Sequence, residues 1–213
     1  MIAVISGTTG LTGSLLFSKL LADKSISEVI SVTRKSLNVN NPKLKEVIVN
    51  DFANLLDYSD ELKGDIYFCC LGTTIKQAGS KENFRKVDFN SIVNFGKIAE
   101  KNMAKTFTVI SAMGASPTSK IFYNKVKGET ECALMELKIN RLIIMRPGLL
   151  IGERNEIRLA EKATISIFNS LSKILPAAIK NRIATPVEKL TSRMLKEGMN
   201  SAPKIKIINA IDI

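Results

Sequence analysis

The chain begins with a short apolar segment that runs directly into three evenly spaced glycines, Ile2-Ala3-Val4-Ile5-Ser6-Gly7-Thr8-Thr9-Gly10-Leu11-Thr12-Gly13. A short apolar run that ends in glycine is typical of a buried parallel strand. Glycine at every third position allows a sharp turn, a close approach of the backbone to a diphosphate, and tight packing of the next helix. The helix predicted to open at about Gly10 would direct N–H groups at that diphosphate. A strand-to-helix turn without a ligand has the same pattern.

The second predicted strand, residues 28–33, ends in the basic pair Arg34-Lys35. This position is about 20 residues beyond the glycine turn, where a dinucleotide fold meets the adenosine ribose. An acidic side chain there would accept from the ribose 2′-hydroxyl of NAD, whereas a basic pair suits the 2′-phosphate of NADP. A basic surface turn is the alternative interpretation. We therefore expect NADP(H) as the preferred cofactor and NAD(H) as the second choice, contacted by the turn residues Gly7, Thr9, Gly10, Leu11, Thr12 and Gly13.

Strand and helix signals alternate along the rest of the chain. Further strands are predicted at residues 46–50, 65–71, 106–110, 141–146 and 204–208. A long helix is predicted over residues 80–101, with its apolar side formed by Phe84, Val87, Ile92 and Phe95. This alternation predicts an α/β fold with one doubly wound parallel sheet and helices on both faces. We expect a single domain over residues 1–213, in which residues 152–185 form a small substrate cap with a helical stretch around 157–175.

Two loops at the ends of predicted strands should line the cofactor crevice, because a dinucleotide lies across the carboxyl ends of the strands in such a sheet. Asp51 and Phe52 follow the third predicted strand and form a plausible wall for the adenine ring. Leu71, Gly72 and Thr73 follow the fourth predicted strand. We expect all five residues to contact the cofactor.

The chain contains no histidine, which removes the commonest general base and the commonest metal ligand. We expect no metal site, and acid–base chemistry must use tyrosine, lysine or a carboxylate. Tyr123 and Lys127 stand four residues apart, so a helix places both side chains on one face. A lysine ammonium near a phenol favours the phenolate, which makes Tyr123 a usable acid or base. Ser111, at the end of the preceding strand, could donate to a substrate carbonyl and hold it facing Tyr123.

The order of these motifs resembles the short-chain dehydrogenase/reductase superfamily, in the atypical branch with a Gly-x-x-Gly-x-x-Gly turn. More narrowly, the chain is similar to the small oxidoreductases related to the Tat-interacting protein. The resemblance to the superfamily rests on the glycine turn, on Ser111, on the segment from Tyr123 to Lys127, and on Arg146-Pro147-Gly148. The narrower resemblance rests on residues 70–74, 123–129, 146–152 and 184–190. It implies a Rossmann fold, NADP(H) as cofactor, and catalysis by Ser111, Tyr123 and Lys127.

The resemblance also implies contacts that the residues themselves leave open. Pro147 and Gly148 would bring the backbone close to the nicotinamide amide, although the end of a strand explains the same dipeptide. Many family members use a helix asparagine to relay protons. Its equivalent is unassigned among the candidates Asn83, Asn90 and Asn94.

The amino-acid composition limits the classes of partner that the protein is expected to bind. The net charge of +11 comes from 31 basic and 20 acidic residues, but the lysines are scattered, which indicates a solvated surface rather than an anionic partner. Few aromatic residues and no recognition motif argue against nucleic acid. Residues 1–22 lack a basic leader, no run approaches the roughly 18 apolar residues of a membrane span, and three cysteines fit a reducing compartment. We therefore expect a cytoplasmic protein with a small-molecule substrate, no nucleic-acid or membrane partner, and an oligomeric state that the sequence leaves open.

Two functions fit these residues. The first is an NADP(H)-dependent oxidoreductase that transfers a hydride between nicotinamide and a small carbonyl or alcohol, with tyrosine as acid and base. The alternative is an NADP(H)-sensing regulatory or protein-binding module with little catalysis. The alternative is motivated by the length of the chain, which is too short to hold the substrate domain of many extended relatives.

Overall fold

The computed structural model describes residues 1–152, 184–200, 202 and 204–213. Its main feature is a seven-stranded sheet in the order β3-β2-β1-β4-β5-β6-β9, in which every adjacent pair of strands is parallel. The strands are β1 (Ile2–Ser6), β2 (Glu28–Thr33), β3 (Leu44–Ile48), β4 (Ile66–Cys69), β5 (Thr106–Ile110), β6 (Arg141–Arg146) and β9 (Lys204–Asn209). The predicted α/β class and doubly wound parallel sheet are confirmed.

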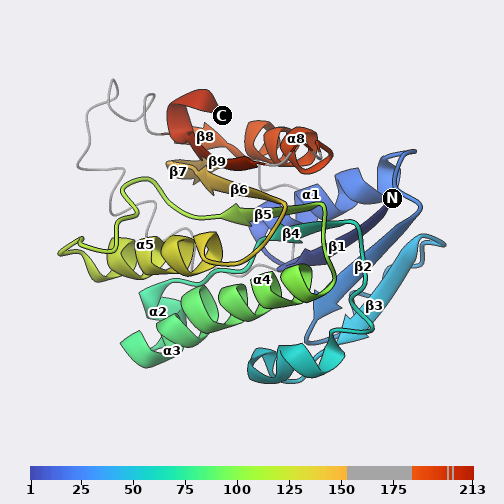
Figure 1. The fold of residues 1–213 in the computed structure, drawn as a ribbon, viewed down its shortest axis with the longest axis horizontal. Coiled ribbons are helices and arrows are strands. Elements are labelled where there is room, and N and C mark those ends of the chain that lie inside the picture. Colours follow the sequence, from blue (N-terminus) through green and yellow to red (C-terminus); the bar gives the residue numbers. More distant parts are fainter. Residues whose placement is uncertain (153–183, 201, 203) are drawn as a thin grey trace.

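Helices cover both faces of this sheet (Figure 1). On one face lie α1 (Leu11–Ala22) and α8 (Val187–Gly198), and on the other lie α4 (Ile92–Lys101) and α5 (Phe122–Met135). The shorter helical segments are η1 (Phe52–Tyr58), α2 (Ile75–Ala78), α3 (Lys81–Arg85), η2 (Lys86–Ser91) and η3 (Ala210–Asp212). This arrangement leaves the carboxyl ends of β1, β2, β4 and β5 at one edge of the sheet, because the strands are parallel.

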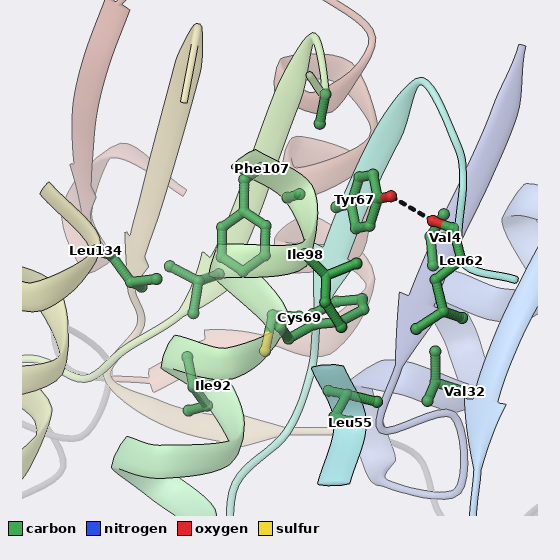
Figure 2. Close-up of a cluster of buried hydrophobic side chains, with 14 of the residues drawn as sticks. Val4, Val32, Leu55, Leu62, Tyr67, Cys69, Ile92, Ile98, Phe107 and Leu134 are labelled. Carbon is green, nitrogen blue, oxygen red and sulfur yellow. Dashed lines mark hydrogen bonds between the residues drawn. The ribbon is translucent and has the colours of Figure 1, made fainter. Parts of the chain in front are cut away.

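The apolar strands serve two cores, because successive side chains of a strand point to opposite faces. On β1, Ala3 and Ile5 join the core beneath α1 and α8, whereas Val4 joins the core beneath α4 and α5. Figure 2 shows the second core, in which Ile92 of α4 and Phe107 of β5 belong to one buried cluster. Burial on both faces is why these strands read as unbroken apolar runs in the sequence.

The predicted long helix over residues 80–101 is interrupted. Between α3 and α4 the chain forms a π-helical stretch, η2, whose wider turn changes which side chains face the sheet. Phe84, Ile92 and Phe95 are buried as predicted. Val87 is only half-buried, and its neighbour Asp88 is fully buried in its place. The prediction for Val87 is therefore wrong, because it assumed an uninterrupted α-helical period.

Other boundaries also differ from the sequence prediction. The third strand is β3 (Leu44–Ile48) rather than residues 46–50, because Leu44 pairs with Val29 of β2 at the start of the ladder. After β6, two short strands that the sequence did not indicate, β7 (Leu149–Ile151) and β8 (Ala184–Pro186), form a small parallel sheet. Most of the substrate cap expected at 152–185, with its helix around 157–175, lies outside the described residues.

Candidate active site

The glycine turn after β1 leaves no room for side chains at two of its positions. Gly7 has a φ of +81°, and a Cβ on it would lie 2.4 Å from the carbonyl oxygen of Cys70. A Cβ on Gly13 would lie 2.0 Å from the carbonyl oxygen of Gly7. At Gly10, in contrast, the nearest atom to an added Cβ is that same carbonyl oxygen, at 3.4 Å. The turn is thus packed against β4 and α1, while Gly10 borders open space.

The N-terminus of α1 fits a phosphate group. Gly10 precedes the helix, no side chain caps it, and the first turn holds no acidic residue. The first N–H groups of a helix lack partners within the helix and carry partial positive charge. A diphosphate would satisfy these donors. Thr9 is exposed, Leu11 is half-buried and Thr12 is buried, so Thr9 and Gly10 form the outer surface of the turn.

The basic pair lies at the same edge of the sheet as the glycine turn, since β2 is parallel to β1 and adjacent to it. Arg34 and Lys35 are both exposed. The loop that follows them is held by the carboxylate of Glu46 on β3, which accepts from the Ser36 hydroxyl at 2.8 Å and from the Leu37 N–H at 2.6 Å. Two cations are therefore presented to solvent on a loop that is fixed behind them.

Asp51 and Phe52 have structural tasks at the start of η1. The Asp51 carboxylate accepts from the Ala53 N–H at 2.9 Å and caps this helical segment. Phe52 is half-buried and packs against the core beneath α4 and α5. Asp51 itself is exposed, so both residues combine a local packing role with a place beyond the carboxyl end of β3.

A buried ion pair stands at the centre of the site. Lys127 on α5 places its Nζ 2.8 Å from Oδ1 of Asp88, and the two side chains are only 5% and 1% exposed. The same Nζ lies 3.5 Å from the carbonyl oxygen of Ile110, at the end of β5. Burial alone would lower the pKa of Lys127, but the charge of Asp88 and then that of Tyr123 outweigh it, and the pKa is raised. Lys127 is consequently a fixed, charged ammonium group.

Asp88 is the site residue that the sequence prediction missed. Its carbonyl oxygen accepts from the Thr130 hydroxyl at 2.8 Å, which fixes η2 against α5. Of the three asparagines considered for a proton relay, Asn83 and Asn90 are exposed and Asn94 is half-buried. The one available signal was an acidic residue flanked by apolar neighbours in a helix otherwise expected to be amphipathic, and a strict helical period placed it on the wrong side.

The loop after β4 reaches the same ion pair. The Thr73 N–H donates to Oδ2 of Asp88 at 2.8 Å. A Cβ on Gly72 would lie 3.5 Å from Oδ1 of Asp88 and 3.8 Å from Nζ of Lys127. Leu71 packs against the core beneath α4 and α5. The structure therefore brings the expected cofactor loop and Lys127 together, with the Asp88 carboxylate joining them.

Tyr123 is one helical turn before Lys127 on the same face of α5 and is half-buried. Its ring centroid is 5.6 Å from that of Phe84 on α3, and the Phe84 ring is 5.7 Å from that of Phe122. Tilted aromatic contacts at these separations are favourable. They hold the phenol ring in place independently of its hydroxyl group.

Ser111 has an unexpected partner. Its hydroxyl donates to Oε1 of Glu131, which follows Lys127 by one further turn of α5, and both Ser111 and Glu131 are buried. Arg146, the last residue of β6, binds the two oxygens of Glu131 at 3.0 and 2.5 Å. The sequence predicted that this hydroxyl would face a substrate carbonyl beside Tyr123. In the structure the hydroxyl faces Glu131.

Pro147 and Gly148 link several segments. The carbonyl oxygen of Pro147 accepts from the Met113 N–H at 2.9 Å, in the loop after β5. The N–H of Gly148 donates to the buried hydroxyl of Thr185 on β8 at 3.0 Å. These bonds fix the position of the backbone beyond β6, so the dipeptide has a structural role there.

Several known proteins resemble this chain over most of its length. No protein-family model matches it. HTATIP2 of Rattus norvegicus is 32% identical over 197 residues, which cover 91% of this chain and 81% of HTATIP2. FMP52 of Candida albicans, named as mitochondrial, is 31% identical over 214 residues, which cover 98% of this chain and 93% of FMP52. The chain belongs to the HTATIP2 and FMP52 family of atypical short-chain dehydrogenase/reductases.

Solved structures also resemble this member of the HTATIP2 and FMP52 family in fold. The structure of MoeE5 with UDP-glucuronic acid and NAD matches with a TM-score of 0.73 at 14% identity, covering 99% of this chain and 76% of MoeE5. At this identity the likeness concerns the fold, which is the Rossmann fold of dehydrogenases and epimerases.

The family also corrects one expectation from the sequence. The cytoplasmic location is wrong, because FMP52 relatives from several yeasts are named mitochondrial. The expectation rested partly on the composition of residues 1–22. These residues form β1 and α1, so their composition reflects their place in the folded domain.

Across the described parts of the chain, the structure contains no helix with the length and hydropathy needed to cross a bilayer.

Proposed function

We propose that this protein is an NADP(H)-dependent oxidoreductase that transfers a hydride between nicotinamide and a small carbonyl or alcohol. The observation that carries the proposal is the buried Asp88–Lys127 ion pair, which lies against Gly72 and on the same helix face as Tyr123. Lys127 lies one helical turn from Tyr123, whose hydroxyl group would exchange a proton with a substrate oxygen.

Each residue then has a definite task. Tyr123 gives a proton to the carbonyl oxygen in reduction and takes it from the alcohol in oxidation. Lys127 places a positive charge near Tyr123, and Asp88 keeps Lys127 in place and charged. Ser111 can bind the substrate oxygen once its hydroxyl turns from Glu131. The dinucleotide, when bound, would supply or take up the hydride at the carbon atom that carries this oxygen.

The cofactor part of the proposal rests on two features. The uncapped N-terminus of α1 suits the diphosphate, and the exposed Arg34 and Lys35 suit a 2′-phosphate. Asp51, Phe52, Leu71, Thr73, Pro147 and Gly148 are proposed as further cofactor contacts from their places beyond the strand ends. The fold relative MoeE5 was solved with NAD, so the preference for NADP(H) is the part that needs a direct test.

Thermal unfolding of the full chain with each dinucleotide provides that test. A ligand that binds only the folded state stabilises it by RT ln(1 + [L]/Kd), about 2.7 kcal/mol at a hundredfold excess over Kd. NADPH and NADP should raise the melting temperature more than NADH and NAD. A panel of small aldehydes, ketones and quinones with NADPH, followed by loss of nicotinamide absorbance, then tests for turnover. If no dinucleotide shifts the transition, the proposal fails.

We expect Arg34→Ala to weaken NADPH binding by about tenfold and to leave NADH binding unchanged. A charge-assisted hydrogen bond to a phosphate contributes about 1.5 to 3 kcal/mol, and NADH lacks that phosphate. Titration of each dinucleotide by isothermal calorimetry measures the difference. Lys24→Ala is a matched control, because Lys24 is an exposed cation at the opposite end of β2. Equal losses for NADPH and NADH in Arg34→Ala would contradict the assignment.

The glycine turn offers a second paired test. Gly13→Ala should destabilise the fold by about 3 kcal/mol, because its Cβ would overlap the Gly7 carbonyl oxygen at 2.0 Å. Gly10→Ala should fold normally, since its Cβ meets nothing closer than 3.4 Å, and yet weaken NADPH binding by about tenfold. Denaturant melts and NADPH titrations separate the two effects. Normal NADPH affinity in Gly10→Ala would place the diphosphate elsewhere.

One observation favours a second candidate function, an NADP(H)-sensing protein with little catalysis. The Ser111 hydroxyl is bonded to Glu131 instead of being directed at a substrate. The carbonyl panel separates the two functions, because rapid turnover of any compound would make sensing secondary. Binding of NADPH without turnover would favour sensing.

A further inference from the structure

Ser111 is the first in a chain of three polar side chains that are joined by hydrogen bonds, and the proposed reaction gives no task to the other two, Glu131 and Arg146. Ser111, the residue after β5, donates a hydrogen bond to Glu131 on α5. Arg146, the last residue of β6, donates two hydrogen bonds to Glu131. The Glu131 side chain is 4% exposed and the Arg146 side chain is 26% exposed. The hydrogen bond from Arg146 to Glu131 outweighs partial burial and raises the pKa of Arg146, so this cation stays charged. The chain runs from solvent to Ser111.

A serine hydroxyl has one proton to donate. Hydrogen bonds to an ionised acceptor are roughly twice as strong as those between neutral groups. While the Ser111 proton is bonded to the Glu131 carboxylate, Ser111 presents only lone pairs to any other group. A substrate carbonyl oxygen, which is itself an acceptor, cannot bond to it in that state.

A water molecule cannot easily replace Ser111 as the hydrogen-bond donor to Glu131. The gap between α5 and β5 that Ser111, Lys127 and Glu131 help to line is too narrow to admit a water molecule. A substrate oxygen that needs the Ser111 proton must therefore displace the carboxylate as acceptor, without a solvent molecule to satisfy Glu131 in exchange. After this exchange, Arg146 is still paired with Glu131, which lowers the free-energy cost of losing the hydrogen bond from Ser111.

We propose that Glu131 is a positioning residue that competes with the substrate oxygen for the Ser111 hydroxyl proton and thereby weakens substrate binding. This inference rests on the proposed oxidoreductase function. Arg146 pairs with Glu131 and holds it within reach of Ser111. Tyr123 and Lys127 do not contribute to this competition, so it affects binding of the substrate oxygen and leaves the proton transfer itself unchanged.

Two variants isolate the competing bond. Glu131→Asp keeps the charge for Arg146 but is one methylene too short to reach Ser111. Glu131→Gln keeps the length but replaces the ionised acceptor with a neutral one. The matched control is Glu197→Gln, because Glu197 on α8 forms a buried ion pair with Arg141, the first residue of the same strand β6. It removes a comparable carboxylate far from Ser111.

Steady-state kinetics with phenanthrenequinone and NADPH give the first readout. Both Glu131 variants should lower KM by about fivefold with kcat changed less than twofold, since a weaker competitor improves ground-state binding. Glu197→Gln should lower the melting temperature and leave KM and kcat as in the wild type. An unchanged or increased KM in both Glu131 variants, or a large fall in kcat, overturns the proposal and leaves Glu131 with a structural role.

A crystal structure of the NADPH complex gives a readout that does not depend on turnover. The wild type should show the Ser111 hydroxyl on Glu131, and Glu131→Asp should show it turned away from residue 131. A wild-type hydroxyl already turned away from Glu131 overturns the proposal, whether or not any carbonyl is reduced. If the wild type binds NADPH but neither it nor a variant turns over, the oxidoreductase proposal fails, and the serine orientation still decides the inference.

Discussion

Tyr123→Phe is expected to abolish turnover while NADPH affinity stays within about twofold of the wild type. General acid–base catalysis typically contributes a factor of about 10² to 10⁴, and this change removes the group that would exchange the proton. The ring should keep its position, because its contact with Phe84 at 5.6 Å does not involve the hydroxyl. Carbonyl reduction followed by NADPH absorbance, together with an NADPH titration, measures both quantities.

Tyr67→Phe is the matched control for this experiment. The Tyr67 hydroxyl lies in the core on β4, where it donates to the Leu62 carbonyl oxygen (Figure 2) and accepts from the Asn102 amide at 3.0 Å. Its removal should lower stability by about 1 to 3 kcal/mol, because it leaves buried polar groups unpaired, and should leave turnover intact. Retained turnover in Tyr123→Phe would remove Tyr123 from the mechanism.

The second large effect is expected at the buried ion pair. Asp88→Leu should destabilise the protein by about 3 to 5 kcal/mol, because it leaves the Lys127 ammonium uncompensated in a buried site. Lys127→Met should cost a similar amount by stranding the Asp88 carboxylate. The double variant Asp88→Leu with Lys127→Met removes both charges and should regain more than half of the lost stability. All three variants should lack turnover.

Urea melts of the four proteins complete a double-mutant cycle that separates pairing from packing. Additive losses in the double variant would contradict the assigned ion pair. Turnover in the double variant would contradict its role in catalysis. The Thr73 N–H loses its acceptor when Asp88 is replaced, so recovery of stability should be incomplete.

The same pair sets a pH dependence. The folded-state pKa of Lys127 is raised above that of an ordinary lysine, despite burial, by Asp88 and then by Tyr123. The stabilisation is therefore fully present below the unfolded-state pKa of about 10.4 and is lost as the pH rises through the raised folded-state value. Between pH 7 and 9 the contribution of this group should be constant.

The sequence by itself determined the parallel sheet, the glycine turn, and the placement of Tyr123 and Lys127 on one helix face. The strands at 2–6, 28–33, 106–110 and 141–146 have the predicted bounds, because strands buried on both faces are rich in apolar residues, and three of these four end directly before glycine, arginine or proline. The glycine turn and the shared helix face of Tyr123 and Lys127 follow from local geometry alone. These features depend on residues close together along the chain.

The tertiary structure decided the partners of these residues. The π-helical stretch η2 moved Asp88, and not Val87, to the buried side, where it meets Lys127. Ser111 bonds to Glu131 because β5 and α5 pack together, and Glu131 pairs with Arg146 because β6 ends beside them. Such bonds join segments distant in sequence, and one added residue in a helical turn changes which side chain is buried. No local pattern encodes either, so the electrostatics of the site were set by packing.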